Sequence, residues 1–321
     1  MSEALSGHIE RLTELFRRSG SKHEAHLRSQ DVLKEMASDP SVLAAVFEKY
    51  LARPGVLNSS HYPVIGIEIE LNPHYGLVAN CWIPLPDRRT DVSTKAIHHH
   101  GEMLLTTVTA FGPGYEHWTF SRPSLADPER ELFTLSVLER EPHPLGHAAF
   151  VDAYVPHLPL YPGALTITLA LWSHRSHTSW KDRVKRLPFL KGREAALRKL
   201  GVGLGLSRAL DLKVVHYFDF CPSAGGFRGL SERTEFERGP NSDFLYSLFH
   251  VLQRTRHPHL AARIESQLKS AEGIENRELV ESLLRDLRLG RDIEGRLSVG
   301  HFDQPSANFT KDEIARALAS V

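Results

Sequence analysis

The sequence HHHGE at residues 98–102 decides the fold that we predict for this chain. It lies within AIHHHGEMLLTTVTAF at 96–111, an apolar run that is typical of a β-strand and ends at a glycine–proline turn signal. Side chains alternate between the faces of a strand, so we expect His98, His100 and Glu102 to point the same way and the middle histidine to point the other way. Two imidazoles and a carboxylate on one face indicate a metal site.

Three adjacent histidines also have a simpler interpretation, which is a solvated surface tract or a chance cluster. The apolar strand that follows them favours burial, because the rim of a β-barrel would direct the ligands inward. A buried polar group without a partner costs roughly 2 to 7 kcal/mol, and a divalent metal removes that cost by taking the lone pairs. The metal site is therefore the preferred hypothesis.

Short apolar and alternating runs surround the histidines and are separated by proline and glycine. No helical pattern lies between them, which is typical of an antiparallel barrel or sandwich rather than a doubly wound sheet. The runs are VIGIEIEL (64–71), GLVANCWIPL (76–85), AIHHHGEMLLTTVTAF (96–111), YEHWTF (115–120), LFTLSVLE (132–139), HAAFVDAYV (147–155) and ALTITLALWS (164–173). Residues 60–175 are predicted to form one β unit.

Helical patterns precede and follow this β unit. Apolar residues recur at helical spacing before residue 55, where Asp39 and Pro40 are a predicted N-cap and first helical position. After Trp180 the sequence is basic and helical, and Thr310 begins a capping box before a last helix. We therefore expect three segments, namely an N-terminal helical segment (1–55), the β-barrel (60–175) and a mostly helical C-terminal extension (176–321), in which DLKVVHYFDF at 211–220 adds a strand to the edge of the barrel.

The composition excludes several classes of protein. Lysine plus arginine and aspartate plus glutamate number 39 each, so the chain lacks the positive field of a nucleic-acid-binding protein. Cys81 and Cys221 are far apart and outside any CxxC pair, which disfavours zinc modules and disulfide scaffolds and fits a reducing compartment. No stretch is apolar enough to cross a bilayer. We expect a cytoplasmic protein whose partner is a small molecule, not nucleic acid or a membrane.

A third metal ligand must come from another strand. His157 lies shortly before the apolar run at 164–173, and His147 and His117 are its competitors, each explained equally well as a hydrogen-bonded structural histidine. His147 precedes a full predicted strand, which would separate it from His157 by about 26 to 33 Å at roughly 3.3 Å per residue. Both therefore cannot bind the same metal unless that segment bends sharply.

The pattern HxH, an apolar strand, a glycine turn and a later histidine before another apolar strand resembles the two-motif arrangement of the cupin superfamily. More narrowly, ANCW at 79–82, IHHH at 97–100, and Gly112 with EHWTF at 116–120 resemble the core of the cysteine-dioxygenase family of thiol dioxygenases. The resemblance covers about residues 75–172. It implies a cupin barrel, also called a double-stranded β-helix or jelly roll.

The resemblance also implies a site and a reaction. The matching positions would hold one Fe(II) ion through His98, His100 and His157. The position of the glutamate ligand of most metal cupins is occupied here by Leu104 or Leu105, so the implied set has three histidines. Thiol dioxygenases bind a thiol substrate through sulfur and amine and add both atoms of O2 to the sulfur.

Three further residues are candidates for catalysis. Glu102 is expected on the strand face of the ligands, and His117 is expected on the returning strand at 115–120. Arg228 belongs to the glycine-rich segment 221–229, which would clamp an acidic substrate if it folded over the barrel as a lid; a plain connecting loop is the alternative.

The leading hypothesis for function is a non-haem Fe(II) dioxygenase, an oxidoreductase that uses O2 on a small polar substrate such as a thiol or an amino acid. A second is an isomerase, lyase or hydrolase that uses Zn, Mn or Ni as a Lewis acid. A third is a non-enzymatic cupin that binds a small ligand, with the terminal helices as the interface of a homodimer.

Overall fold

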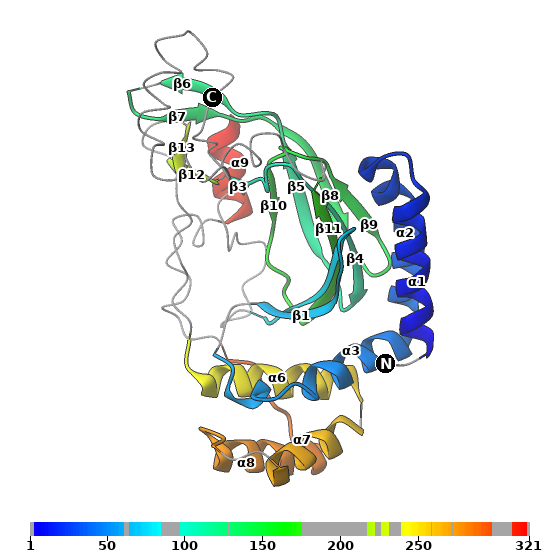
Figure 1. Ribbon diagram of the computed structural model, residues 1–321. Coiled ribbons are helices and arrows are strands. Elements are labelled where there is room, and N and C mark those ends of the chain that lie inside the picture. The colour runs from blue at the N-terminus through cyan, green and yellow to red at the C-terminus, as the bar shows by residue number, and fades with distance from the viewer. Residues whose placement is uncertain are drawn as a thin grey trace, which may run out of the picture.

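Two antiparallel β-sheets flanked by helices make up the part of the chain that the computed structural model describes (Figure 1). The described residues are 3–60, 64–84, 97–127, 129–174, 217–221, 226–230, 239–257, 259–270, 273–296 and 310–319. The prediction of an antiparallel β unit with helical flanks is confirmed. Within these ranges no helix has the length and apolar character needed to span a membrane.

The sheets contain five and eight strands, in the orders β1-β2-β11-β4-β9 and β6-β7-β13-β12-β3-β10-β5-β8. The strands are β1 (Val64–Leu71), β2 (Gly76–Trp82), β3 (Ile97–His98), β4 (Met103–Phe111), β5 (Tyr115–Phe120), β6 (Ser124–Asp127), β7 (Leu132–Thr134), β8 (Val137–His143), β9 (Ala148–Val151), β10 (His157–Pro159), β11 (Thr166–His174), β12 (Tyr217–Cys221) and β13 (Gly226–Leu230). β12 pairs with β3, so the run at 211–220 does add a strand beside the histidines.

Between β2 and β11 the chain crosses repeatedly from one sheet to the other, although β5 to β8 all lie in the eight-stranded sheet. β2, β4, β9 and β11 lie in the five-stranded sheet, whereas β3, β5, β8 and β10 lie in the other. Strands that are distant in sequence therefore become neighbours, and β10 lies between β3 and β5. This topology places residue 157 directly opposite residue 98.

The two sheets face each other across a partly polar interior. The Trp82 ring on β2 contacts the Tyr115 ring on β5, with ring centroids 5.4 Å apart. The Thr107 hydroxyl on β4 lies 3.2 Å from Nε2 of His143 on β8. Because β-strand side chains alternate, the opposite faces of both sheets are available for packing against helices.

The N-terminal helices cover the outer face of the five-stranded sheet (Figure 1). They are α1 (Glu3–Arg18), α2 (Lys22–Ser38) and α3 (Pro40–Leu51), followed by the 3-10 turn η1 (Val56–Asn58). The predicted N-cap is confirmed, because the Asp39 side chain accepts a hydrogen bond of 2.8 Å from the Ser41 amide. Leu12 and Phe47 from these helices belong to the same core as Leu169 of β11.

The C-terminal helices divide between the two sheets. α6 (Asn241–Thr255), α7 (His259–Ser270) and α8 (Arg277–Arg288) join the core of the N-terminal helices. α9 (Lys311–Ala319) instead places Ile314 in a second core with Trp118 and Phe218, on the outer face of the eight-stranded sheet. The predicted capping box is confirmed: the Thr310 amide donates to Glu313 Oε2 at 2.7 Å, and the Glu313 amide donates to Thr310 Oγ1 at 3.3 Å.

Three predicted strands have different bounds in the structure. The run at 96–111 is broken into β3 and β4 by a turn, 132–139 is divided between β7 and β8, and the strand expected at 147–155 ends at Val151. Gly101, at a φ of 63°, lies in the break of the first run, because a strand cannot continue through that conformation. Tyr154, at a φ of 62°, lies within the part of the third run that is not a strand. The basic helical stretch expected after Trp180 and residues 211–216 lie outside the described residues.

A buried histidine that the sequence did not single out attaches α2 to the five-stranded sheet. His26 is completely buried, its Nδ1 lies 2.8 Å from the Thr106 hydroxyl, and its Nε2 lies 2.9 Å from the Ser173 hydroxyl. Burial, with smaller effects from Lys22 and His23, lowers the pKa of His26 to about 3. The folded protein therefore holds this imidazole neutral at physiological pH.

The stability of the fold should consequently decrease below about pH 6.5. In the unfolded chain a histidine takes up a proton near its ordinary pKa of about 6.5, whereas folded His26 resists protonation down to about pH 3. The unfolded state binds more protons in this window, so lower pH favours unfolding by up to about 1.4 kcal/mol per pH unit. We expect His26→Gln to reduce the difference between the unfolding free energies at pH 7.5 and pH 5.0 by roughly 2 kcal/mol in urea titrations.

His259 provides the matched control, because it is exposed on α7. His259→Gln should leave the pH dependence of unfolding unchanged. A His26→Gln variant with the full wild-type pH dependence would contradict the neutral, doubly hydrogen-bonded state of His26.

Candidate metal centre

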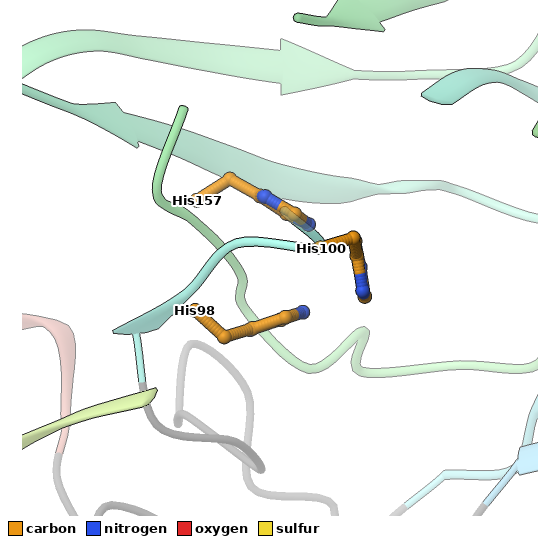
Figure 2. A group of neighbouring side chains, drawn as sticks. All are labelled: His98, His100 and His157. Atoms are coloured by element: carbon orange, nitrogen blue, oxygen red, sulfur yellow. The ribbon is translucent and has the colours of Figure 1, made fainter. Parts of the chain in front are cut away.

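Three histidines, two from the segment at β3 and one from β10, converge where these two strands pair (Figure 2). The ring centroids of His98 and His157 are 4.4 Å apart, those of His98 and His100 4.8 Å, and those of His100 and His157 5.2 Å. One nitrogen of each ring lies within 4.8 Å of the other two. Among the residues that the structure describes, no other group of three or more His, Cys, Asp or Glu side chains brings ligand atoms this close.

Strand pairing and a turn produce this convergence. His98 on β3 is directly opposite His157 on β10, so their side chains project from the same face of the sheet. His100 is not on a strand, because the chain turns at Gly101, whose φ of 63° suits glycine. The Tyr154 amide donates a 2.8 Å hydrogen bond to the Gly101 carbonyl and ties this turn to the segment before β10.

His98, His100 and Glu102 were predicted to share one face of a strand, and this explanation is wrong because His100 and Glu102 are not on a strand. The rings of His98 and His100 nevertheless lie close together. A turn, rather than period-two spacing, brings the His100 ring back toward His98. Glu102 is half-buried within the turn and is not a member of the three-histidine group. His99 points into a separate environment, where its ring lies 5.7 Å from the Tyr154 ring and 6.2 Å from the Phe218 ring.

The surroundings of the ligands differ in exposure. His98 and His157 are buried, with 3% and 4% of their surface exposed, whereas His100 is exposed. His157 Nδ1–H donates to the Val155 carbonyl at 3.3 Å, which leaves Nε2 with the lone pair that a metal needs. Metal–nitrogen bonds of about 2.1 Å place neighbouring ligand nitrogens roughly 3 Å apart, and the three ring nitrogens here lie within 4.8 Å of one another.

His117 lies on the inner face of β5, next to the three histidines. Its ring centroid is 5.5 Å from that of His157, and no described residue hydrogen-bonds its ring nitrogens. Burial lowers the pKa of His117 to about 4, so the imidazole is neutral at physiological pH. A neutral imidazole beside a metal site is able to accept a proton or a hydrogen bond from a bound molecule.

His147, the competitor for the third ligand position, belongs to a different cluster. Its Nδ1 lies 3.0 Å from Nδ1 of His143, and its Nε2 lies 3.0 Å from a carboxylate oxygen of Glu141. The segment between His147 and His157 is not one continuous strand, because β9 ends at Val151. The three-histidine group accordingly contains His157 and not His147.

Arg228 is exposed on β13, in register with residue 219 of β12. β12 lies between β13 and β3, so two strand positions separate Arg228 from His98 in the sheet. The segment expected to be a lid is thus largely a β-hairpin, with residues 222–225 outside the described residues. The role of Arg228 as a substrate clamp stays a prediction. The catalytic roles of Glu102 and His117 stay predictions as well.

Comparisons with known proteins find no matching family model and no matching curated protein. The chain resembles several solved structures in part. TT1209 from Thermus thermophilus is 16% identical, with 40% of this chain and 95% of that chain covered and a TM-score of 0.25. An oxalate oxidase in complex with the substrate analogue glycolate is 11% identical (50% and 76% covered, TM-score 0.23), and FeII HppE in complex with substrate is 12% identical (43% and 97% covered, TM-score 0.23). TM-scores of this size assign neither a fold nor an activity to this chain.

Replacing either buried ligand should remove metal binding. We expect His98→Ala and His157→Ala to weaken binding of a divalent metal by at least about 100-fold, a larger loss than is typical for residues that only orient ligands. Calorimetric titration and the metal content of protein loaded with Fe(II) under anaerobic conditions would measure this.

His99→Asn and His147→Ala are the matched controls, because both residues lie outside the three-histidine group and asparagine keeps an acceptor for the Gly101 amide, which donates to His99 Nδ1 at 3.0 Å. Both variants should retain the metal. If His147→Ala lost the metal and His157→Ala retained it, the assignment of His157 as the third ligand would be wrong.

Proposed function

We propose that this protein is a cupin-type, mononuclear non-haem iron(II) oxygenase that acts with O2 on a small polar substrate. The observation that carries the proposal is the convergence of three imidazoles on the inner side of a two-sheet β unit. The strand order supports the fold, because β2-β11-β4-β9 facing β3-β10-β5-β8 is the arrangement of a jelly roll, the architecture to which cupins belong.

The ligand chemistry supports a catalytic metal rather than a structural one. Imidazole is a ligand for iron, zinc, copper and nickel, whereas magnesium and calcium prefer oxygen. Structural zinc sites are closed by four protein ligands, but three histidines leave positions for a substrate. Bound there, iron would supply open coordination positions and one-electron chemistry with O2. Iron is favoured over zinc, manganese or nickel by the resemblance of residues 75–172 to the thiol dioxygenases.

The charge of the ligand set favours a particular kind of substrate. His98, His100 and His157 bind a metal as neutral imidazoles, so a divalent ion keeps its full positive charge at this site. Such a site attracts an anionic group, for example the thiolate or carboxylate of a small thiol or amino acid. This agrees with the small polar substrate that the sequence predicts.

The neighbouring side chains provide candidate roles in the reaction. Neutral His117 lies against His157 and is placed to accept a proton from a substrate group, since its pKa is lowered to about 4. Glu102 is half-buried two residues after His100 and is a second candidate for proton transfer. Arg228 is exposed and is a candidate for binding the carboxylate of an acidic substrate.

Oxygen-electrode measurements on Fe(II)-loaded protein test this proposal. We expect O2 consumption that depends on the addition of one member of a panel of small thiols and amino acids. His98→Ala should reduce the rate by at least about 100-fold, since the remaining ligands hold the metal poorly. His99→Asn, which keeps an acceptor for the Gly101 amide, should keep most of the activity and so controls for general damage to the fold.

Substrate turnover that needs no oxygen and is supported equally well by Zn(II) would contradict the oxygenase proposal. It would instead favour an isomerase, lyase or hydrolase. Three histidines suit zinc as well, so this second function has the same ligands but a different metal. Tight iron binding without turnover of any panel member would favour a non-enzymatic binding protein.

A further inference from the structure

A cavity of about 510 Å³ lies where β1 and β2 meet helices α3 and α6, and none of the three histidines lines it. Its volume is within the range of about 300 to 1,000 Å³ that is usual for small-molecule sites. Tyr50 of α3 and Phe244 of α6 form one side, and Asn80 and Trp82 of β2 form another. The described residues around it include no charged side chain.

The cavity offers both hydrogen-bond donors and acceptors. Asn80 lies on the face of β2 that also carries Trp82, and its amide has no hydrogen bond to another described residue. A carboxamide can donate two hydrogen bonds and accept two, so Asn80 is able to pair with a polar ligand in both directions. Ser59 and Ser60 add hydroxyl groups to the wall.

The wall formed by residues 58–60 is held in place by the C-terminal helices. The Asn241 side chain at the start of α6 donates to the carbonyls of Leu57 and Ser59, both at 2.8 Å. The Asn58 side chain donates to the Gly273 carbonyl at 2.9 Å. A wall that is fixed before binding reduces the entropy lost when a ligand binds.

An aromatic series separates the cavity from the candidate metal centre. The Trp82 ring contacts the Tyr115 ring, whose centroid is 6.5 Å from that of His117, and His117 in turn contacts His157 at 5.5 Å. Two side chains thus intervene between the cavity wall and the nearest ligand. Binding in the cavity does not require a metal.

We propose that this cavity binds an uncharged molecule with a planar ring and a polar group such as a carboxamide. None of the described lining residues offers an ion an opposite charge, whereas a neutral amide can pair with Asn80. A flat ring packs against the indole of Trp82, whose N–H already donates to the Thr168 hydroxyl at 3.3 Å. The proposal is independent of the oxygenase function.

Binding of benzamide, with benzoate and benzylamine as anionic and cationic probes of similar size, tests the proposal. Saturation-transfer NMR and fluorescence titration of the full chain should detect benzamide binding. Benzoate and benzylamine should bind at least about tenfold more weakly, because neither can both donate to and accept from Asn80 and the described lining residues offer no opposite charge. Absence of benzamide binding, or equal binding of a charged probe, overturns the proposal.

Gly66→Leu would fill the cavity from the neighbouring strand. A Cβ at Gly66 meets only the Asn80 side chain within 4 Å, at 3.8 Å, so the substitution adds volume without a backbone clash. It should abolish benzamide binding, and Asn80→Ala should weaken it roughly fivefold by removing the amide partner. Asn80→Ala keeps the test decisive if Gly66→Leu does not fold.

Two control variants test whether benzamide binds in this cavity or elsewhere. Glu68→Leu changes the same face of β1 outside the cavity and should leave benzamide affinity unchanged. His98→Ala removes a metal ligand and should also leave it unchanged. Loss of benzamide binding in His98→Ala would show that the probe occupies the metal centre instead, and full binding by both Gly66→Leu and Asn80→Ala would overturn the assignment to this cavity.

Discussion

The pairing of β3 with β10 is the interaction on which the rest of the site depends. Both strands are short, yet they hold His98 opposite His157, and the turn that follows β3 adds His100. Neighbouring strands stabilise the pair, since β12 lies beside β3 and β5 lies beside β10. A fold that separated these two strands would remove His157 from His98 and His100.

The two faces of the eight-stranded sheet carry different kinds of side chain. The inner face carries the histidines, whereas Trp118, Phe120 and Ile97 on the outer face pack into a core that α9 covers. The Trp118 indole donates to Glu116 at 2.6 Å, and Glu116 also pairs with Lys311 of α9. Burial of these large side chains fixes the strands that position the ligands, because close packing leaves little room for displacement.

Two of the buried histidines, His26 and His250, attach helices to the rest of the fold. His26 and His250 each have hydrogen-bond partners suited to a neutral imidazole, namely two hydroxyls for His26 and the Ile293 carbonyl for His250. Burial lowers the pKa of both rings, and their role is to join helices to the rest of the fold. Convergence of ligand nitrogens, rather than burial or histidine content, distinguishes the candidate metal centre.

The sequence by itself determined the local elements and the composition of the site. Period-two and period-3.6 patterns located most strands and helices, and capping residues such as Asp39 and Thr310 marked helix starts, because these signals act within a few residues. His98 and His100 were identifiable from the apolar run that follows them, whereas His157 was one of three candidates for the third position. Only the tertiary structure decided that the chain turns at Gly101, that His26 attaches α2 to the sheet and that the cavity beside Trp82 exists. Each of these depends on contacts between residues that are distant in the chain, and local patterns do not encode which strands pair or which helix covers them.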